Sequence, residues 1–336
     1  MKLLVTRTVS FYDPDPWGSE IDVENEAGYV NSRVDRLPPR LQRVAGKWYE
    51  VRFALRLLRI SRKYDGIAVG RYGIWFPVLQ RVLGLRKRVV MTDIEWREVK
   101  GGRLNRAAAL ASSAVCCNTR VEIERYSLHY GIPREKFVLV PLAFQRRDLH
   151  ESSDEGYVFA GGSQGRDWQT LLDAVDGLPY PVKIFTNRKV PRVPSNTTVD
   201  FVSRETFYRR MAAASCVVVP LLPEPLRITG TTTWTAAMAL GKVVLVTEPD
   251  GAPDYMEQGV SGFYVNHGDA ERLRQTIVMV MENADLRKRV GEAARARAWK
   301  EFSPEVFRRR ILSLLKEDKE GMSMPVSAPT RIDSPG

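Results

Sequence analysis

Short apolar runs and stretches of helical periodicity alternate along most of this 336-residue chain. In the first half, the apolar runs predict strands at residues 2–6, 66–69, 88–91, 115–118 and 137–140. Helical patterns fill the gaps at 44–64, from 75, from 104 and at 121–130. Strands that alternate with helices are typical of a parallel sheet.

The alternation restarts after a polar break, ESSDEG at 151–156. Later strands are predicted at 157–160, 182–185, 216–220 and 243–247, with helices at 168–175, 205–214 and 232–240. The sequence thus predicts an α/β protein of two doubly wound, Rossmann-like domains, at 1–150 and 151–303. We expect a closing helix at 304–316 to pack back on the first domain, and the polar tail at 317–336 to be disordered.

Two segments of the first domain depart from this regular pattern. The stretch at 13–26 is acidic and rich in turn residues, which predicts a loop. The helix at 44–64 carries a row of basic residues beside an apolar stripe made of Val44, Trp48, Val51, Leu55 and Leu58. This helix either covers a sheet with a solvated basic face or lies on an anionic membrane surface.

The net charge of +11 comes entirely from the first domain. Residues 1–150 hold 27 Lys and Arg against 16 Asp and Glu, whereas the remainder holds 24 of each. This asymmetry favours a partner that carries phosphate, such as nucleic acid, anionic lipid or a lipid-diphosphate acceptor. Aromatic residues are not interleaved with the basic ones as in a stacking platform, so no specific nucleic-acid partner is expected.

The sequence offers no pattern typical of a metal site or a membrane span. Cys116, Cys117 and Cys216 lack the paired spacing of a zinc or redox motif, and the three histidines are scattered. We therefore expect no metal and no cofactor. The apolar runs are far shorter than a membrane-spanning helix, and the N-terminus does not resemble a signal peptide. A cytoplasmic location, peripheral on the inner face of the membrane, is expected.

A glycine-rich turn follows the strand predicted at 157–160. The sequence GGSQGRD places Gly161, Gly162 and Gly165 between a strand and a helix, at the sheet edge where parallel sheets bind ligands. Glycines let a phosphate approach the backbone, the helix N-terminus is partly positive, and Arg166 adds a full charge. The pattern indicates a phosphate site, although a tight turn that needs positive φ would use the same glycines.

A second turn of this kind is RITGTTTWTAAM, in which Gly230 precedes Thr231, Thr232 and Thr233 and an Ala-rich helix. Thr231 or Thr232 is expected to cap the helix and to leave other N–H groups for a diphosphate. An ordinary N-cap is the alternative, since most threonines before a helix have that role.

Three longer segments together resemble the donor domain of GT-B glycosyltransferases, in particular the large retaining family 4. They are YVFAGGSQGRDWQTLLDA, FYRRMAAASCVVVPLLPE and TAAMALGKVVLVTEPDGAPDYMEQGVSGFYVNHGDAERL. The resemblance places Arg166 where the family usually has a phosphate-binding lysine. It implies a GT-B fold in which the second domain binds a nucleotide-sugar donor and the cleft between the domains holds the acceptor.

The chain departs from this family at the paired glutamates, which would fall on Ile228 and Ala236. In the family these residues contact the donor's sugar and ribose, so the contacts must differ here. Glu224, four residues before the first position, is either a replacement or a solvated rim residue. The turn at 230–233 is the other candidate replacement; otherwise donor binding is weakened or lost. Gly161 stands where the family often has a second basic residue.

Asp93 follows the strand predicted at 88–91, at an end that faces the cleft in a GT-B fold. A carboxylate there is a candidate general base for an inverting transfer, or it orients the acceptor hydroxyl in a retaining one. An Asp that caps the following turn is the structural alternative. Charge on the leaving diphosphate is then expected to be stabilised by Arg166 and the two helix N-termini.

The sequence therefore predicts a glycosyltransferase that moves a sugar from a nucleotide-diphosphate sugar to a saccharide or lipid-linked acceptor, in the synthesis of cell-surface polysaccharide or glycoconjugates. Two alternatives stay open. A sugar-nucleotide epimerase can share the fold. The absent glutamates would also fit a catalytically lapsed GT-B scaffold or a membrane-associated partner.

Overall fold

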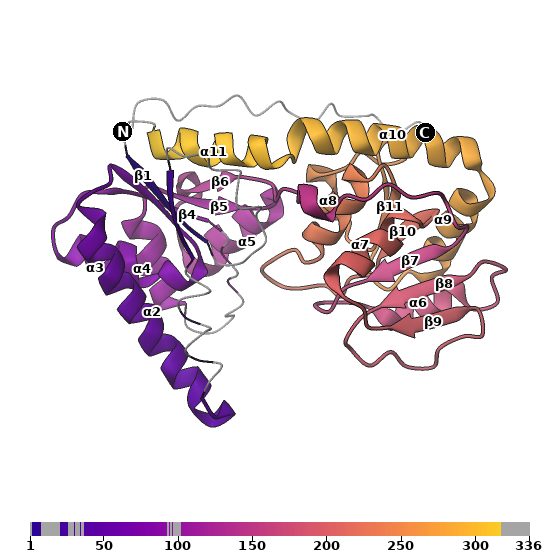
Figure 1. The fold of residues 1–336 in the computed structure, drawn as a ribbon, viewed down its shortest axis with the longest axis horizontal. Coiled ribbons are helices and arrows are strands. Elements are labelled where there is room, and N and C mark those ends of the chain that lie inside the picture. Colours follow the sequence, from indigo (N-terminus) through magenta and orange to yellow (C-terminus); the bar gives the residue numbers. More distant parts are fainter. Residues whose placement is uncertain are drawn as a thin grey trace.

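The computed structural model describes residues 2–7, 21–25, 30, 34, 37–92, 94, 96 and 102–316. These residues form two α/β domains that lie side by side, each built on a six-stranded parallel sheet (Figure 1). The predicted fold class, two doubly wound parallel-sheet domains, is confirmed. The tail at 317–336, which was expected to be disordered, lies outside the described residues.

The elements alternate between strand and helix in both domains. The first domain contains, in chain order, β1 (Leu3–Arg7), β2 (Ile21–Asn25), α2 (Pro39–Ser61), β3 (Gly66–Val69), η1 (Arg71–Gly73), α3 (Trp75–Val82), β4 (Arg88–Met91), α4 (Arg103–Ala111), β5 (Ala114–Cys117), α5 (Arg120–Tyr130), η2 (Arg134–Lys136) and β6 (Phe137–Leu139). The second contains η3 (Arg146–Asp148), β7 (Val158–Gly161), α6 (Trp168–Val175), β8 (Val182–Phe185), β9 (Thr197–Asp200), α7 (Arg204–Ala212), β10 (Cys216–Val219), α8 (Thr231–Ala239), β11 (Val243–Val246), η4 (Ala252–Asp254), β12 (Phe263–Tyr264), α9 (Ala270–Glu282) and α10 (Ala284–Glu301). The last described helix is α11 (Pro304–Lys316).

The strand order of the second sheet determines where a ligand can bind. The order is β12-β11-β10-β7-β8-β9, so the chain leaves β7 toward β8 and later returns to β10 on the other side of β7. Connections therefore diverge at the carboxyl ends of β7 and β10, and crevices at such switch points are the usual ligand sites of open parallel sheets. The first sheet has the order β2-β1-β3-β4-β5-β6.

Both sheets are buried on both faces, as parallel sheets require. In β1, Leu4 packs toward α2, α3, α4 and α5, whereas Leu3 and Val5 pack into the opposite core. In β10, Val217 and Val219 pack toward α7, α8 and α10, whereas Val218 packs toward α6 and α9. The apolar runs in the sequence are continuous for this reason.

Helix α11 returns to the first domain. It continues in line with α10, so that the two helices extend end to end across both domains (Figure 1). Phe307, Ile311 and Leu315 complete the core on the outer face of the first sheet. The Arg88 side chain donates a hydrogen bond of 2.6 Å to the carbonyl oxygen of Leu314. This helix therefore ties the end of the described chain to the first domain.

The predicted loop at 13–26 is wrong for its last part, because Ile21–Asn25 forms the edge strand β2. This strand pairs in parallel with β1, with Leu3 opposite Ile21. Ile21 is buried and Asp22 is exposed, which is the alternation of a half-buried strand. Its carboxylates have polar partners at the sheet edge, since Asp22 accepts a hydrogen bond from the Tyr64 hydroxyl at 2.6 Å and Glu24 pairs with Arg56 at 3.0 Å. An acidic composition is therefore compatible with an edge strand. Residues 8–20 lie outside the described part.

The predicted apolar stripe of the helix at 44–64 covers the sheet only in part, because Leu58 packs against the core while three of the other stripe residues are exposed. Helix α2 begins at Pro39, and Val44 is 71% exposed, Trp48 51% and Leu55 52%. Phe53 is fully buried instead, together with its neighbours on the opposite face of the second half of the helix. The reason is that the first half of α2 projects beyond the sheet (Figure 1).

Candidate active site

A cavity of about 540 Å³ lies between the two domains, beside the carboxyl ends of β7 and β10. This volume is within the range of small-molecule sites. The first domain contributes Ile94, Asn118, Glu122, Leu142, Ala143 and Gln145. The second contributes residues 162–164, Arg166, Phe201, Val202, Arg204, Phe207, Tyr208 and residues 227–233. The cavity is therefore built by both domains.

The loop after β7 is held against the loop after β10. The backbone N–H of Leu222 donates to the carbonyl oxygen of Gly165 at 2.9 Å. Gly162 has φ +115° and Gly165 has φ +60°, and both values favour glycine. A Cβ atom on Gly162 would lie 2.3 Å from Nη2 of Arg166. The glycine is required because it leaves room for this guanidinium.

Three hydrogen bonds fix the half-buried guanidinium of Arg166. It donates to the carbonyl oxygens of Gly161 and Gln164, both at 2.8 Å, and to Oγ1 of Thr233 at 3.1 Å. Burial lowers the pKa of Arg166 to about 10, so the group stays charged at neutral pH. No carboxylate among the described residues forms an ion pair with it. The cavity therefore has a positive charge available for an anion.

Helix α8 presents its N-terminus to the same cavity. Its N-cap residue is Gly230, with φ +81°, and no side chain caps the helix. The expectation that Thr231 or Thr232 caps it is wrong, because the helix begins at Thr231 and both threonines lie inside the first turn. By contrast, α6 is capped by the side chain of Asp167. The uncapped first turn of α8 has a partial positive charge and N–H groups suited to an anion.

The structure brings together most of the residues predicted to bind the donor. Those that line the cavity are Gly162, Arg166, Gly230, Thr231, Thr232 and Thr233. The remaining ones, Gly161, Gly165 and Glu224, lie directly behind this lining. Gly161 is the last residue of β7, and a Cβ on Gly165 would lie 2.7 Å from Oγ1 of Thr229. Glu224 forms an ion pair with Arg227 at 2.9 Å. Their roles in donor binding stay predictions.

Asp93, the predicted catalytic carboxylate, lies outside the described residues. The residues on either side of it, Thr92 and Ile94, are described and buried. Ile94 lines the cavity. The carboxyl end of β4 therefore reaches the cavity, as the prediction requires, and the role of Asp93 itself stays a prediction.

Three charged residues of the cavity, Glu122, Arg204 and Arg227, were not predicted from the sequence. Arg227 donates from Nε to Glu224 and from Nη2 to Oε1 of Gln164 at 3.2 Å, so it joins the two glycine-containing loops. Glu122 lies in the first turn of α5, where the side chain of Thr119 caps the helix. The spacing of Thr119 and Glu122 is that of a capping box, a signal for a helix start and not for a cavity.

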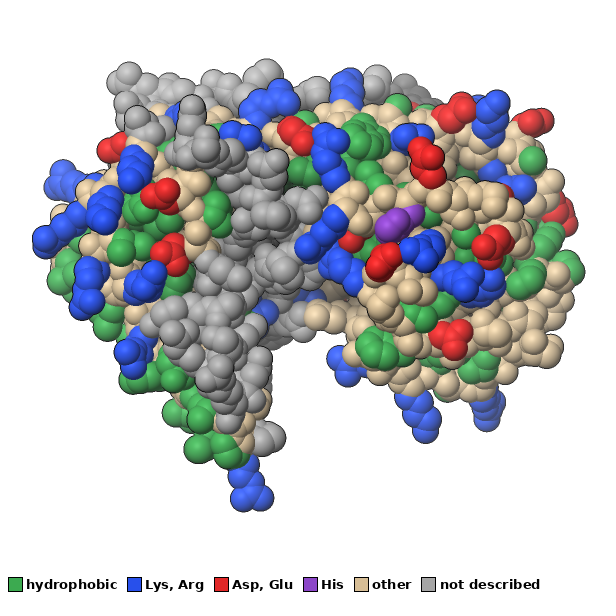
Figure 2. Space-filling model, in the orientation of Figure 1, with side chains coloured by type: hydrophobic (Ala, Val, Ile, Leu, Met, Phe, Trp, Pro, Cys, Tyr) green, Lys and Arg blue, Asp and Glu red, His purple; other side chains and the backbone are tan. Residues whose placement is uncertain are grey.

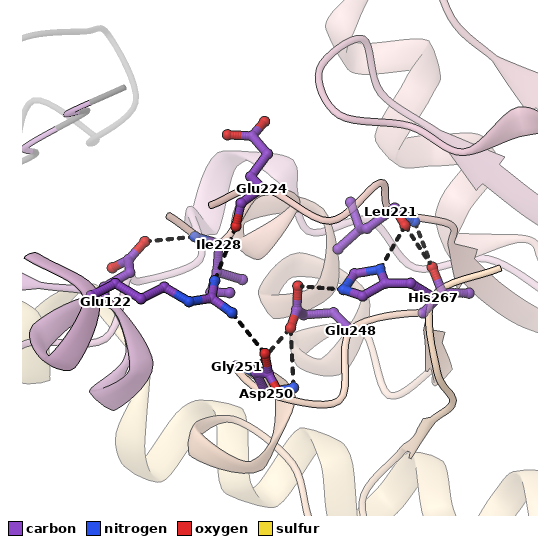
Figure 3. A network of polar contacts seen from close by, with 10 residues as sticks. Glu122, Leu221, Glu224, Ile228, Glu248, Asp250, Gly251 and His267 are labelled. Carbon is purple, nitrogen blue, oxygen red and sulfur yellow. Dashed lines mark hydrogen bonds and ion pairs between the residues drawn. The ribbon is translucent and has the colours of Figure 1, made fainter. Parts of the chain in front are cut away.

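A chain of polar contacts crosses from the first domain to the second (Figure 3). The Glu122 carboxylate accepts a hydrogen bond from the backbone N–H of Ile228 at 2.9 Å. Arg125, from the same helix, donates to the carbonyl oxygen of Glu224 at 3.1 Å and pairs with Asp250 at 2.7 Å. Helix α5 is therefore joined to two loops of the second domain.

The network continues to the loop that holds Arg166. The Glu248 carboxylate accepts from the backbone N–H groups of Asp250 and Gly251, and lies 3.3 Å from Nε2 of His267 (Figure 3). The other ring nitrogen of His267 lies 2.9 Å from the carbonyl oxygen of Leu221, which forms a backbone bridge with Arg166. The domain interface and the arginine loop are thus parts of one hydrogen-bonded network.

Within the described ranges, no group of three or more His, Cys, Asp or Glu side chains is placed to hold a metal ion. Among the helices that the structure describes, none combines the length and apolar character needed to span a membrane.

Two doubly wound domains with a cavity between them, at the switch point of the second sheet, define the GT-B class of fold. Solved structures agree with this assignment. HepE from Anabaena, solved in complex with UDP, matches with a TM-score of 0.68 and 17% identity, covering 94% of this chain and 99% of that chain. A glycosyltransferase from Rickettsia africae ESF-5 matches with a TM-score of 0.65 and 14% identity, covering 94% and 97%. Sucrose-phosphate synthase from Thermosynechococcus elongatus matches with 0.65 and 14%, covering 83% and 79%.

Part of the sequence is also similar to a known protein family. Residues 197–297 match the family described as glycosyl transferases group 1. These residues include β10, α8 and the Gly230 turn. A search of the curated proteins found no match. The chain is therefore a glycosyltransferase of the GT-B fold, and residues 197–297 in its second half are similar to group 1 glycosyl transferases.

Proposed function

We propose that the cavity binds a nucleotide-diphosphate sugar and that the enzyme transfers the sugar to an acceptor in the cleft. One observation carries this proposal: the Arg166 guanidinium and the uncapped N-terminus of α8 converge on one place. A diphosphate suits both groups, because it can accept charge-assisted hydrogen bonds from the arginine and from the helix N–H groups. Anabaena HepE has been solved with UDP, with UDP and glucose, and with UDP-glucose, which supports a donor of this kind.

The proposed chemistry follows from the same groups. As the bond between the sugar and the diphosphate breaks, negative charge grows on the leaving phosphate. Arg166 and the α8 N-terminus are placed to stabilise that charge without reorganisation. Asp93 would take a proton from the acceptor hydroxyl or orient it. In this scheme the reaction needs no metal, so transfer should continue in the presence of EDTA.

A thermal-shift screen against UDP, GDP, ADP and their common sugar conjugates tests the donor site. A ligand that binds only the native protein at 100 times its Kd adds about 2.7 kcal/mol of stability, which corresponds to a rise in Tm of about 5 °C or more. A rise with one nucleoside diphosphate identifies the base. No rise with any of them would contradict the proposal and favour a lapsed scaffold. Conversion of the free nucleotide sugar without an acceptor would favour the epimerase.

For the acceptor, we propose a saccharide or lipid-linked sugar at an anionic membrane surface, in polysaccharide or glycoconjugate synthesis. An exposed apolar face of α2 supports this proposal. Leu41, Val44, Trp48 and Leu55 are all more than half exposed, and their spacing of three, four and seven residues puts them on one helix face. Basic side chains flank this face, and Arg52 lies over the Trp48 ring at 4.6 Å. Figure 2 shows hydrophobic side chains along the projecting end of α2 and a basic side chain at its tip.

This combination is suited to the interface of an anionic leaflet, where apolar side chains insert and basic ones meet lipid phosphates. Sedimentation with vesicles of phosphatidylcholine, with and without phosphatidylglycerol, tests it on the full chain. Binding should need the anionic lipid and should weaken at least fivefold in Trp48→Glu. Leu128, an 88% exposed residue of α5, provides the control Leu128→Glu, which should bind as the wild type does. Equal loss in both variants, or no binding at all, would contradict a membrane role for α2.

A further inference from the structure

Glu122 is a buried carboxylate whose position is not explained by helix capping alone. It is 3% exposed, it accepts from the backbone N–H of the N-cap Thr119 as in a capping box, and its Oε2 also accepts from the backbone N–H of Asn118 at 2.8 Å. Its other oxygen, Oε1, accepts a hydrogen bond from the backbone N–H of Ile228, which belongs to the second domain. Within the described part of the chain, no lysine or arginine forms an ion pair with this group. Arg227, which lines the same cavity, acts on it only through space and favours its charged form, while burial disfavours that form more strongly. A buried carboxylate without an ion pair is costly, so its presence indicates a role beyond packing.

Glu122 lies close to the groups that are proposed to bind the diphosphate. Ile228, which donates to its carboxylate, is two residues before Gly230, the N-cap of α8. Consecutive Cα atoms are about 3.8 Å apart, so these two residues are separated by no more than about 7 Å. Since the carboxylate lies 2.9 Å from the Ile228 nitrogen, it is within about 10 Å of the helix N-terminus. Glu122 is also the only Asp or Glu among the described residues that line the cavity.

The cavity thus has two electrostatically different ends. Arg166 and the α8 N-terminus attract an anion, whereas the carboxylate of Glu122 repels one. The backbone N–H groups of Asn118, Thr119 and Ile228 occupy three of the four lone-pair positions of this carboxylate, so one can accept a further hydrogen bond. The complementary ligand at this end is a neutral group rich in hydroxyl donors, which is the chemistry of a sugar.

We infer that Glu122, a residue of the first domain, binds a hydroxyl group of the donor's sugar while Arg166 binds the diphosphate. This inference rests on the proposed function and assigns the sugar end of the donor site. It makes sugar binding depend on contact between the domains, because the same carboxylate also holds the N–H of Ile228. Burial raises the pKa of Glu122 to about 7, whereas its backbone hydrogen bonds act in the opposite direction. A hydroxyl donor from a bound sugar would also favour the carboxylate form.

The test compares a nucleotide with its sugar conjugate on the full chain. Isothermal titration with UDP and with UDP-glucose, or with GDP and GDP-mannose if guanine is the preferred base, gives Kd values for the wild type and for Glu122→Gln. A lost hydrogen bond to a charged group corresponds to about tenfold in affinity. We expect Kd for the sugar conjugate to rise about tenfold, with less than a twofold change for the free diphosphate.

Thr119→Ala is the matched control, since it removes the cap of the same helix and leaves the carboxylate in place. It should lower Tm and change neither Kd by more than twofold. If Glu122→Gln does not fold, Glu122→Asp takes its place, with the same difference expected between the two ligands. An equal rise in Kd for both ligands, or no change in either Kd, overturns the inference about Glu122 but does not contradict the proposed donor site. Failure of the wild type to bind any of these nucleotides overturns the proposed function together with it.

Discussion

Replacement of Arg166 by alanine should separate donor binding from folding. The side chain makes three hydrogen bonds, two of them to backbone carbonyl oxygens that can be solvated from the cavity after its removal. Its pKa of about 10 lies below the ordinary value of 12.5 because burial disfavours the charge. The substitution also removes this unfavourable burial of charge, which offsets part of the stability lost with the three hydrogen bonds. We therefore expect the free energy of unfolding of the unliganded protein to change by about 1 kcal/mol or less.

The effect on a diphosphate should be much larger. A hydrogen bond to a charged group contributes about 1.5 to 3 kcal/mol, which corresponds to a 10- to 150-fold change in Kd. Arg166 has no carboxylate partner among the described residues, so its full charge is available to the ligand. Its removal leaves the N-terminus of α8 as the remaining phosphate contact, with only a partial charge.

Isothermal titration with UDP at fixed ionic strength measures this effect, because salt screens exposed charges far more than enclosed ones. Arg188 provides the control: it donates to the carbonyl oxygen of Ser163 in the same loop at 3.0 Å, but it does not line the cavity. Arg188→Ala should change Kd by less than about threefold. The reasoning is refuted if Arg166→Ala binds UDP within twofold of the wild type, or if both variants lose affinity equally.

Three further predictions concern stability and loop geometry. The pKa of Glu122 is about 7 in the native protein against 4.5 ordinarily, so the native state binds this proton more tightly than the unfolded chain. The free energy of unfolding should therefore fall by up to about 3 kcal/mol as pH rises from about 4.5 to 7. Urea unfolding at pH 5 and pH 8 should show this extra loss in the wild type relative to Glu122→Gln. The buried hydroxyl of Tyr255 accepts from the backbone N–H of Leu142 at 2.9 Å and donates to the carbonyl oxygen of Asn118 at 3.0 Å, both in the first domain. Tyr255→Phe should therefore lower the free energy of unfolding by about 2 kcal/mol and leave the Kd for UDP unchanged. A loss below about 0.5 kcal/mol would contradict this. Gly162→Ala should both destabilise the fold and displace Arg166, weakening UDP binding tenfold or more, whereas Gly156→Ala, at φ +76° with open space around it, should cost about 1 kcal/mol of stability and no affinity.

Much of the fold could be predicted because its strands are buried on both faces. A parallel strand covered by helices on both sides must be apolar at every position, and such runs at 66–69, 115–118, 216–220 and 243–247 are visible without any alignment. The edge strand β2 was missed since one of its faces meets water. Its alternation of Ile21, Asp22, Val23 and Glu24 was hidden by the acidic composition around it.

The phosphate end of the site was also visible in the sequence, because its components are local. Glycines, an arginine and threonines lie next to two predicted helix starts, and the structure places Gly162, Arg166 and Gly230 at one cavity. The N-cap of α8 was predicted one or two residues too late, a usual error where several threonines are adjacent. No local pattern indicated Glu122, since a glutamate three residues after a threonine is ordinary capping chemistry.

The sequence by itself determined the elements, the two domains and the residues at each strand end, because these depend on periodicity and on conformations that only certain residues adopt. Tertiary structure alone decided which ends meet. The return of the chain from β9 to β10 on the far side of β7 puts two loops, more than sixty residues apart in the chain, at one switch point. Contact between the domains then brings Glu122 to Ile228, and the length of α2 beyond the sheet leaves its apolar face exposed. Such contacts depend on packing over the whole molecule, for which no short segment of sequence holds the information.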